Sequence, residues 1–534
     1  MNRLKKTAKT AVSAMAVCLG ISLLAGCGGN SEEQGVSAAP SPGGASAAPA
    51  STGPKKEISV SIFDRGAVSA EEGSYESNRW TKWINENAPA TVKWVPVPRN
   101  EAQTKLNTLI ASGSAPDLIW EFDRNYIAQL ANQGAIQPID SYIEKYSTSY
   151  KKYLQEHPEL KPYLTFDGKM YAVTSARDVG SIANHGMWIR QDWLDKLGLK
   201  MPTTQEEFLE VARKFKSGDP DGNGKADTVP IAFHGNSMSI LRAVFGTQEN
   251  QWYVENDKLQ FGRISDRYRD SLAFQKQLFD EGLIDKEYIT DKSFQRSQQF
   301  ITTGQAGIYL ASWNIESAYR DLKKNVPDAK LVPMEPFSTK YGKYGLYQEA
   351  PANILTAFNA NMKESQIEAA VKFLDWMLDT GWKPLRNGVE NVHVKYVNEV
   401  PKVIDADKLK KEVSYANEYA VVSQYTIKPE FYPIMAADDA LSQEYAKLRS
   451  QSLETALKNK FRRDIAYSPS MTEYTQLLAT FAPIAQQIEA KIITGSTTPD
   501  GGMEELRKEW KRLGGENVEK IVNEWYQKNK DQLK

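Results

Sequence analysis

The first 26 residues constrain the chain most, because they contain the three parts of an export signal. A basic start, from Arg3 to Lys9, is followed by an apolar run from Ala11 to Leu24 and then by the small residues Ala25 and Gly26. The apolar run is shorter than the roughly 20 residues that a membrane-spanning helix needs. We therefore expect residues 1–26 to be a signal peptide, and the mature domain to fold outside the cytoplasm.

Cys27 directly follows this signal. The stretch Leu24-Ala-Gly-Cys27 resembles the lipobox of bacterial lipoproteins. That resemblance implies that the Cys27 sulfur takes a diacylglycerol and becomes the new N-terminus, with palmitate as a further acyl group. Two acyl chains hold a protein on a bilayer, whereas a single chain holds it only marginally. We expect a lipid anchor on the outer face of the bacterial cell membrane; the alternative is an ordinary secreted protein with an incidental cysteine.

The composition narrows the class further. The chain has 534 residues, 41% hydrophobic and 25% charged, which is typical of a soluble protein with two or three domains or lobes. Its 66 basic and 67 acidic side chains give a net charge of -1, which argues against nucleic acid as a partner. Cys18 and Cys27 are the only cysteines, so the mature domain has no disulfide. We expect it to be a monomer.

Residues 27–56 are predicted to be a flexible tether. Gly28 to Pro54 consists largely of Gly, Ser, Ala and Pro and has almost no large apolar side chain. Such a segment cannot bury enough surface to offset the entropy lost on ordering. The tether would hold the folded domain away from the membrane.

The folded part begins with an alternating strand and helix pattern. Ile58, Val60 and Ile62 alternate with serines, and a second strand is predicted at 92–97. A helix is expected over 101–112, followed by a short buried strand at 117–120. Strand, helix, strand, helix, strand predicts a mostly parallel sheet.

The same pattern recurs further along the chain. A strand at 187–189 leads into a helix at 192–197, and Ile308 to Leu310 is predicted to be another strand. Thr204 with Glu207, and Ser365 with Glu368, have the spacing of capping boxes that open two helices. The C-terminal stretch is predicted to be helical. The fold class is therefore α/β with two lobes.

An acidic loop follows the helix that the Thr204 and Glu207 capping box opens. Oxygen-bearing side chains stand at positions 1, 3, 5 and 9, glycine stands at position 6, and the residue at position 7 can offer its backbone carbonyl; the five expected ligands are Asp219, Asp221, Asn223, Lys225 and Asp227. This spacing is typical of loops that bind Ca²⁺ as a structural ion. Position 12 is Pro230 instead of a bidentate glutamate, so an EF-hand is not expected. The alternative is a surface turn rich in Asp, Asn and Gly.

In order and spacing, these features resemble family 1 extracellular solute-binding lipoproteins of bacterial ABC carbohydrate importers, the maltose- and alginate-binding type. The likeness is carried by several stretches, namely Ala111-Ser-Gly-Ser-Ala-Pro-Asp-Leu-Ile119, Gly134-Ala-Ile-Gln-Pro-Ile139, the run from Ile189 to the acidic loop, and Gly304 to Asn314. It covers nearly the whole mature chain. It implies a protein that binds a carbohydrate, expected to be an oligosaccharide, and delivers it to a membrane permease without catalysing a reaction.

The resemblance also implies a periplasmic-binding-protein-like fold, in which two α/β lobes are joined by a hinge and the ligand binds in the cleft between them. By position, the hinge passes near 171–175 and 310–312. The first lobe would combine 57–174 with 313–363, and the second would combine 175–312 with 364–534.

Candidate ligand-binding residues lie where predicted strands end, because ligands of open α/β sheets bind at the carboxyl ends of strands. Aromatic rings cover the apolar face of a sugar, and charged or amide groups bind its hydroxyls. The aromatic candidates are Trp120, Trp188 and Trp313, and the polar candidates are Asp64, Arg65, Asp123 and Asn314.

Two other functions remain open on the sequence alone. An exported glycoside hydrolase would need two carboxylates that flank the scissile bond, and no local motif marks such a pair. The four histidines are scattered without metal-binding spacing, and Ser237 lacks the second glycine of a nucleophile elbow. A lipoprotein on the same fold that binds peptides or signals would share every feature above.

Overall fold

The structure is a computed structural model that describes residues 54–291 and 295–533. Lys55–Lys534 forms one compact unit. The expected signal peptide, Cys27 and almost all of the tether lie outside the described residues. No helix in the described part of the chain has the length and apolar character needed to cross a membrane.

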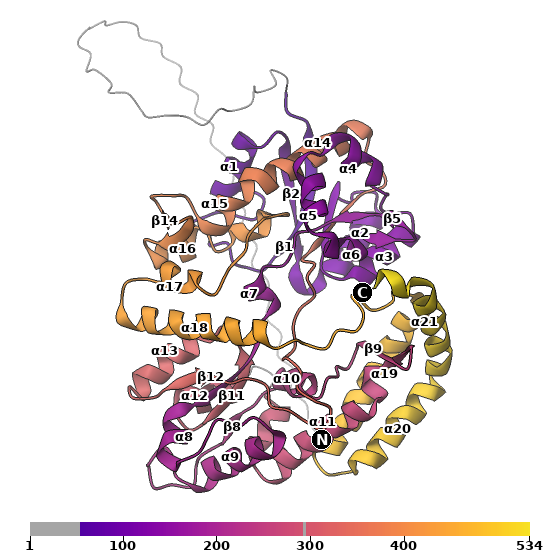
Figure 1. The fold of residues 1–534 in the computed structure, drawn as a ribbon. Coiled ribbons are helices and arrows are strands. Elements are labelled where there is room, and N and C mark those ends of the chain that lie inside the picture. Colours follow the sequence, from indigo (N-terminus) through magenta and orange to yellow (C-terminus); the bar gives the residue numbers. More distant parts are fainter. Residues whose placement is uncertain (1–53, 292–294, 534) are drawn as a thin grey trace, which may run out of the picture. The chain divides into compact units, whose positions relative to one another are not determined.

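A first, five-stranded sheet begins the folded part (Figure 1). Its strands stand in the order β2 (Thr91–Pro98), β1 (Glu57–Asp64), β3 (Leu118–Glu121), β13 (Leu355–Phe358) and β6 (Ala172–Val173). The first three strands are parallel, and β13 runs antiparallel to β3 and β6. Ile58, Val60 and Ile62 of β1 are fully buried, and so is Ser61 on the opposite face. Burial on both faces is what a parallel sheet covered by helices requires.

A second, four-stranded sheet has the order β12 (Leu331–Pro333), β7 (His185–Arg190), β11 (Ile308–Ser312) and β8 (Ile231–Ala232). β7 runs antiparallel to both of its neighbours, and only β11 and β8 are parallel. This sheet is therefore mixed and not mostly parallel. Three hairpins lie outside the two sheets, namely β4 (Thr165–Phe166) with β5 (Lys169–Met170), β9 (Trp252–Glu255) with β10 (Lys258–Phe261), and β14 (Val394–Val397) with β15 (Val400–Val403).

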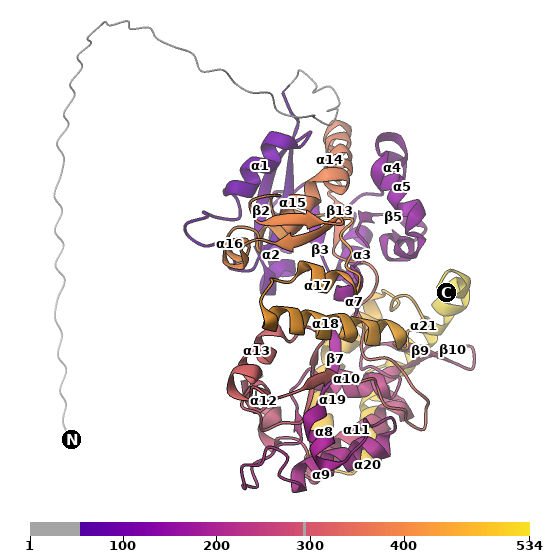
Figure 2. The same ribbon diagram turned by 60° about the vertical axis from the view of Figure 1, so that its left-hand side comes forward.

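Helices fill most of the remaining chain (Figures 1 and 2). They are α1 (Arg79–Asn87), α2 (Ala102–Ala111), α3 (Arg124–Asn132), α4 (Asp140–Tyr146), α5 (Ser149–Glu156), α6 (Lys161–Leu164), α7 (Val179–Ile182), α8 (Gln191–Leu197), α9 (Gln205–Ser217), α10 (Ser237–Val244), α11 (Asp266–Asp280), α12 (Gln295–Thr302), α13 (Glu316–Asn325), α14 (Glu364–Trp376), α15 (Trp382–Asn387), α16 (Ala406–Glu412), α17 (Phe431–Met435), α18 (Ala440–Lys458), α19 (Thr472–Ile493), α20 (Pro499–Arg512) and α21 (Gly515–Asn529).

The two predicted capping boxes have different outcomes. Thr204 caps α9, and its hydroxyl accepts from the Glu207 amide while the Glu207 carboxylate accepts from the Thr204 amide. The second box, Ser365 with Glu368, is not formed. The helix α14 begins two residues earlier than that box requires, at Glu364, and Gln366 accepts from the backbone amide of Lys363 instead.

The described residues contain two hydrophobic cores, one beneath each sheet. One core draws on residues 58–173 and 352–422, and the other on 183–346 and 427–533. This division differs from the expected lobe ranges. The segment 313–346 belongs to the second core, because β12 pairs with β7, and the segment 367–422 belongs to the first, because α14 packs on β1 and α4. We call the two parts the first and the second lobe.

Three stretches link the lobes, at 174–182, 347–351 and 423–426. They hydrogen-bond to one another: the Arg177 amide donates to the Pro351 carbonyl, the Ser423 amide to the Ser175 hydroxyl, and the Glu349 amide to the Ile182 carbonyl. The first linker overlaps the expected hinge at residues 174 and 175. Residues 310–312 instead form the end of β11 inside the second sheet, so the second crossing occurs about 35 residues later than expected.

Candidate functional site

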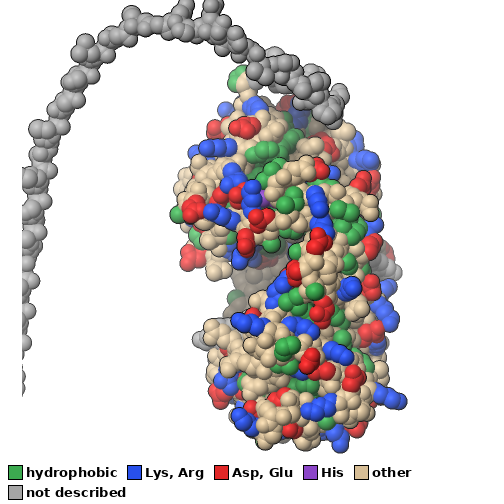
Figure 3. Space-filling view, turned by 90° about the vertical axis from the view of Figure 1, so that its left-hand side faces the viewer, with side chains coloured by type: hydrophobic (Ala, Val, Ile, Leu, Met, Phe, Trp, Pro, Cys, Tyr) green, Lys and Arg blue, Asp and Glu red, His purple; other side chains and the backbone are tan. Residues whose placement is uncertain are grey.

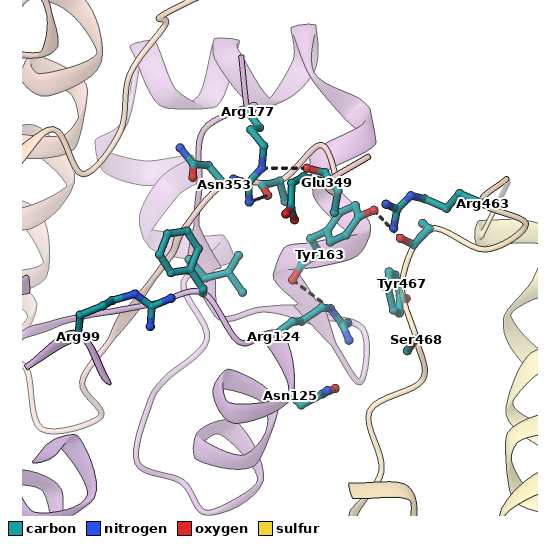
Figure 4. A pocket seen from close by; sticks show the side chains of 15 residues that line it. Arg99, Arg124, Asn125, Tyr163, Arg177, Glu349, Asn353, Arg463, Tyr467 and Ser468 are labelled. Atoms are coloured by element: carbon teal, nitrogen blue, oxygen red, sulfur yellow. Dashed lines mark hydrogen bonds between the residues drawn. The ribbon is translucent and has the colours of Figure 1, made fainter. Parts of the chain in front are cut away.

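A cavity of about 520 Å³ is lined by both lobes and by the linkers. Figure 4 shows the side chains that surround it. The first lobe contributes Arg99, Phe122, Arg124, Asn125, Tyr163 and Asn353, the linkers contribute Arg177 and Glu349, and the second lobe contributes Arg463, Tyr467 and Ser468. A cavity of this size falls within the usual range for small-molecule sites, roughly 300–1,000 Å³.

The end of β3 positions the first side of this cavity. The Glu121 carboxylate accepts from the backbone amides of Phe122 (2.7 Å) and Asp123 (3.1 Å), which fixes the turn out of the strand. Burial raises the pKa of Glu121. The Asp123 side chain accepts from the Asn125 amide (2.9 Å) and so caps α3. The Phe122 ring stacks on Phe63 at 5.5 Å and presents an apolar surface to the cavity.

Arg124 connects the two sides. Its guanidinium donates to the carbonyls of Pro162, Tyr163 and Thr165 at 3.0–3.3 Å. The same group lies over two rings, Phe166 at 4.4 Å and Tyr467 at 3.8 Å. Removal from water lowers the pKa of Arg124 to about 10. Such a lowering indicates a cation with little compensating negative charge around it.

The stretch after α18 forms the opposite side. Tyr467 is half-buried and packs against both hydrophobic cores. The Tyr163 hydroxyl donates to the Ala466 carbonyl, and the Tyr163 and Tyr467 rings meet edge to face at 5.7 Å. Arg463 donates through Nη2 to the Gln348 carbonyl at 2.7 Å, and thereby ties this stretch to a linker. The cavity therefore has an aromatic wall from each lobe, Phe122 and Tyr467.

A second cavity of about 640 Å³ lies in the second lobe, at the ends of β7 and β11. Its polar lining includes Asn184, His185, His234, Ser312 and Asn314. Burial lowers the pKa of His234 to about 4 and also lowers that of His185, so both rings are neutral at pH 7. This cavity offers mostly neutral hydrogen-bonding groups and one carboxylate, Glu316, in contrast to the arginine-rich first cavity.

The structure places the three predicted tryptophans in the hydrophobic cores. Trp120 is 4% exposed, Trp188 is 0% exposed and Trp313 is 6% exposed. Trp120 stacks on Phe63, and the Trp188 indole donates to the Ser312 carbonyl at 2.8 Å. The Trp313 ring meets Trp188 edge to face and covers Gly186, where an added Cβ would lie 2.6 Å from the ring. Trp120 and Trp188 lie within buried strands and Trp313 directly follows one, so all three rings pack inside the cores and leave no face for a ligand.

The four predicted polar residues are not brought together. Asp64 accepts from the Gly66 amide at 2.8 Å and lines a separate, smaller cavity in the first lobe. Arg65 pairs with Glu418 at 2.7 Å, and Asp123 serves as the cap of α3. Asn314 lines the second cavity, where its side-chain oxygen accepts from the Tyr445 hydroxyl at 3.0 Å.

The acidic loop gathers its carboxylates around one amide. The Asn223 side chain donates through Nδ2 to Asp221 (2.8 Å) and to Asp227 (3.0 Å). The Asp219 carboxylate accepts from the backbone N–H of Asn223 at 3.1 Å. One oxygen of Asp221, Oδ1, is buried without a hydrogen-bond partner, and burial raises the pKa of this carboxyl. Lys225 donates its backbone amide to Asn223 Oδ1 at 2.7 Å.

The loop thus has the oxygen atoms that Ca²⁺ prefers, together with one buried oxygen that lacks a partner. In this arrangement the side-chain amide of Asn223 lies between the carboxylates of Asp221 and Asp227. Within residues 54–291 and 295–533, no group of three or more His, Cys, Asp or Glu side chains is arranged to hold a metal ion.

Sequence reasoning missed the arginines and Tyr467 of the first cavity. Phe122 and Arg124 directly follow the predicted strand at 117–120, so the rule that ligands bind at strand ends could have identified them. Arg463 and Tyr467 lie between α18 and α19 in a stretch without helix or strand, and no periodicity marks them. Arg177 and Glu349 face the cavity only because the linkers bring them there.

Comparisons with known proteins agree with this architecture. A family model described as bacterial extracellular solute-binding protein matches residues 80–384. Lipoprotein LipO of Bacillus subtilis is 27% identical over 453 residues, which cover 82% of this chain and 86% of LipO. The fructooligosaccharide ABC transporter substrate-binding protein FusA of Streptococcus pneumoniae is 38% identical over 199 residues, which cover 34% of this chain and 37% of FusA.

Solved structures show the same fold at low identity. An HMO-binding solute-binding protein associated with an ABC transporter of Bifidobacterium longum infantis superposes with a TM-score of 0.69 at 20% identity, over 88% of this chain and 98% of that one. FusA in complex with kestose superposes with a TM-score of 0.64, over 89% of this chain and 100% of that one. The fold class expected from the sequence, the α/β architecture of periplasmic binding proteins, is confirmed.

Proposed function

Because the chain belongs to the bacterial extracellular solute-binding proteins, whose family model covers residues 80–384, we propose that it binds an oligosaccharide between its two lobes and delivers it to the permease of an ABC importer. The observation that carries this proposal is the cavity lined by both lobes and their linkers. A solute bound there contacts both lobes at once. Differential contact of this kind is what favours a closed arrangement over an open one.

The lining suits a sugar. Phe122 and Tyr467 offer ring faces for the apolar side of a pyranose or furanose, and Asn125, Asn353 and Ser468 offer hydrogen-bonding groups for hydroxyls. FusA is described as a fructooligosaccharide-binding protein, which supports the same class of ligand here. We propose that the protein releases the solute unchanged and acts as a monomer.

The membrane anchor and the metal are further parts of the proposal. Lipidation at Cys27 would hold the domain on the outer face of the cell membrane, and the relative LipO is a lipoprotein. We propose that Asp219, Asp221, Asn223, the Lys225 carbonyl and Asp227 bind Ca²⁺ after the Asn223 side chain turns its oxygen inward. One solved structure of FusA is of an EF-hand mutant, which supports a calcium loop in this group of proteins. The ion would order the loop and take no part in solute binding.

A sugar panel tests the proposed function. The mature domain, residues 55–534, is titrated by calorimetry with neutral and acidic oligosaccharides and with peptides, and the mixtures are analysed for cleavage products. The expected result is binding of at least one oligosaccharide with no cleavage, and a higher melting temperature by mass action. Cleavage would reassign the protein as a hydrolase, and binding of peptides alone would reassign its ligand class.

A further inference from the structure

The cavity between the lobes has a strong excess of positive charge. Arg99, Arg124, Arg177 and Arg463 line it, against a single carboxylate, Glu349. The whole chain is balanced, with 66 basic and 67 acidic side chains. Figure 3 shows charges of both signs interspersed over one face of the molecule. The excess in the cavity is therefore local and does not reflect a basic protein.

These arginines contact carbonyls and rings, and among the described residues none of them forms an ion pair. Arg177 donates to the carbonyls of Ala350 (3.2 Å) and Ala352 (3.4 Å). Arg99 lies over the Phe63 and Phe122 rings at 4.7 and 5.0 Å. By contrast Arg462, the neighbour of Arg463 in the chain, pairs with Glu255 and Asp464, each at 2.8 Å.

The four arginines do not contribute equally to the excess of positive charge in the cavity. Two buried carboxyls, Glu121 and Glu418, interact electrostatically with the Arg99 guanidinium. Arg99 is therefore partly compensated by the protein. Among the described residues that line the cavity, Glu349 is the one carboxylate beside Arg124, Arg177 and Arg463, and it accepts from the Asn184 side chain at 3.3 Å.

Each of these three guanidinium groups also has free donors. The hydrogen bonds of Arg124 and Arg177 to the protein use Nε and Nη2, which leaves Nη1. Arg463 uses Nη2, which leaves Nε and Nη1. Half-buried guanidinium groups without a counter-ion favour an anionic ligand, because charge-assisted hydrogen bonds are the strongest that such a site can form.

We propose that the solute is an acidic oligosaccharide, built of uronic acid residues whose carboxylates pair with Arg124, Arg177 and Arg463. The sugar rings pack against Phe122 and Tyr467 in the same cavity. This inference rests on the proposed function, since it names the class of sugar that the same site binds. A neutral sugar of the same size would leave three guanidinium groups desolvated without compensation, and would bind more weakly.

The matched ligands are trigalacturonate and its fully methyl-esterified form, which share one backbone and differ in charge. By calorimetry we expect the acidic trimer to bind at least about tenfold more tightly, as one charge-assisted contact is worth roughly that factor. Its affinity should fall as salt rises, whereas that of the ester should not. Equal affinity for both trimers would overturn the inference, and so would an acidic trimer whose affinity ignores salt.

The matched variants are Arg463→Gln, Arg463→Lys and, as control, Arg512→Gln, which removes an exposed arginine on α20 that pairs with Glu509. We expect Arg463→Gln to weaken binding of the acidic trimer about tenfold or more and that of the ester by less than about threefold. Arg463→Lys should lose less, and Arg512→Gln should match the unmodified domain. Equal losses for both trimers in Arg463→Gln would contradict a role for this charge.

Further ligands distinguish failure of this inference from failure of the proposed function. A trisaccharide that carries sulfate esters and no carboxyl group, and that binds more tightly than trigalacturonate, would overturn the choice of carboxylate. If a neutral trisaccharide such as maltotriose binds more tightly than trigalacturonate, the proposed function stands and this inference falls. If no sugar of any charge binds, the proposed function itself fails.

Discussion

At the residue scale, the second lobe depends on one buried carboxylate. Glu489 on α19 is 5% exposed and accepts from Arg263 Nε at 2.7 Å and from the Tyr268 hydroxyl at 2.8 Å. Arg242, also buried, lies 3.5 Å from the same carboxylate. Two buried guanidinium groups thus share one buried anion, and Glu249 at the margin provides the rest of the negative charge.

We predict that Glu489→Gln lowers the free energy of unfolding by about 3 kcal/mol. Removing one partner of a buried pair costs about 3–5 kcal/mol, and the remaining Glu249 places the loss at the lower end. Urea denaturation of residues 55–534 measures it. The control Glu505→Gln, which breaks an exposed pair with Lys491, should cost less than about 1 kcal/mol. Equal losses in the two variants would contradict the assigned role of Glu489.

His234 makes stability depend on pH. Burial lowers its pKa from 6.5 to about 4 in the folded state. The unfolded chain therefore binds a proton at this position as the pH falls below about 6.5, while the folded chain does not until about pH 4. Protonation then favours the unfolded state, so this group makes stability fall as the pH falls through that window.

We predict that His234→Gln flattens the pH dependence of unfolding between about pH 6.5 and 4. A lowering of the pKa from 6.5 to about 4 corresponds to about 3.4 kcal/mol at most. The measurement is the free energy of unfolding of both proteins at a series of pH values. Parallel curves for the variant and the unmodified protein would show that the folded-state pKa of His234 is not lowered.

At the scale of elements, Asp375 joins two helices of the first lobe. It lies on α14 and accepts from the amides of Thr148 (2.7 Å) and Tyr150 (2.9 Å) and from the Ser147 hydroxyl (2.7 Å). Thr148 is the N-cap residue of α5 and Tyr150 lies in its first turn, where backbone donors have no partner within the helix. One carboxylate thus caps α5 and fixes it to α14.

We predict that Asp375→Ala lowers the free energy of unfolding by about 2 kcal/mol, the upper end of what loss of a cap costs. Glu368→Ala, which removes an exposed carboxylate from the same helix, should change it by less than about 0.5 kcal/mol. Thermal and urea unfolding measure both variants. A loss for Asp375→Ala no larger than that for Glu368→Ala would contradict the capping role.

Also at the scale of elements, the acidic loop leads to a prediction about the melting temperature of the domain. If residues 219–227 bind Ca²⁺, millimolar Ca²⁺ should raise the melting temperature of the domain relative to a chelator, because the ion binds only the folded loop. Asp221→Asn should abolish the shift, whereas Asp195→Asn on the nearby helix α8 should keep it. An unchanged melting temperature in Ca²⁺ and in chelator would assign the loop as a surface turn.

At the scale of the whole molecule, the sequence predicts what depends on local pattern. The strands β1, β2 and β3 follow from alternation and from buried apolar runs within a few residues. The division into lobes does not, because it depends on distant pairings: Leu331 joins β7, and Ile367 returns to the first core. No local signal in the sequence indicates to which lobe such a segment returns. The sequence therefore predicts the segment 313–346 in the first lobe, whereas the structure places it in the second.

The cavity was predictable only in part for the same reason. Phe122 and Arg124 follow a predicted strand and could be found from it. Trp120, two residues earlier, offers the larger ring, but its place inside the strand directs it into the core. Arg463 and Tyr467 come from irregular chain more than 330 residues away from Arg124, and only the fold brings them opposite it.

The most direct test of the central claim is a crystal structure of residues 55–534 with the oligosaccharide that binds most tightly in the panel. The account predicts a sugar held between the lobes, with rings against Phe122 and Tyr467 and polar groups within hydrogen-bonding distance of Arg124 and Arg463. A sugar bound to one lobe alone, or on a surface away from these four residues, would contradict it.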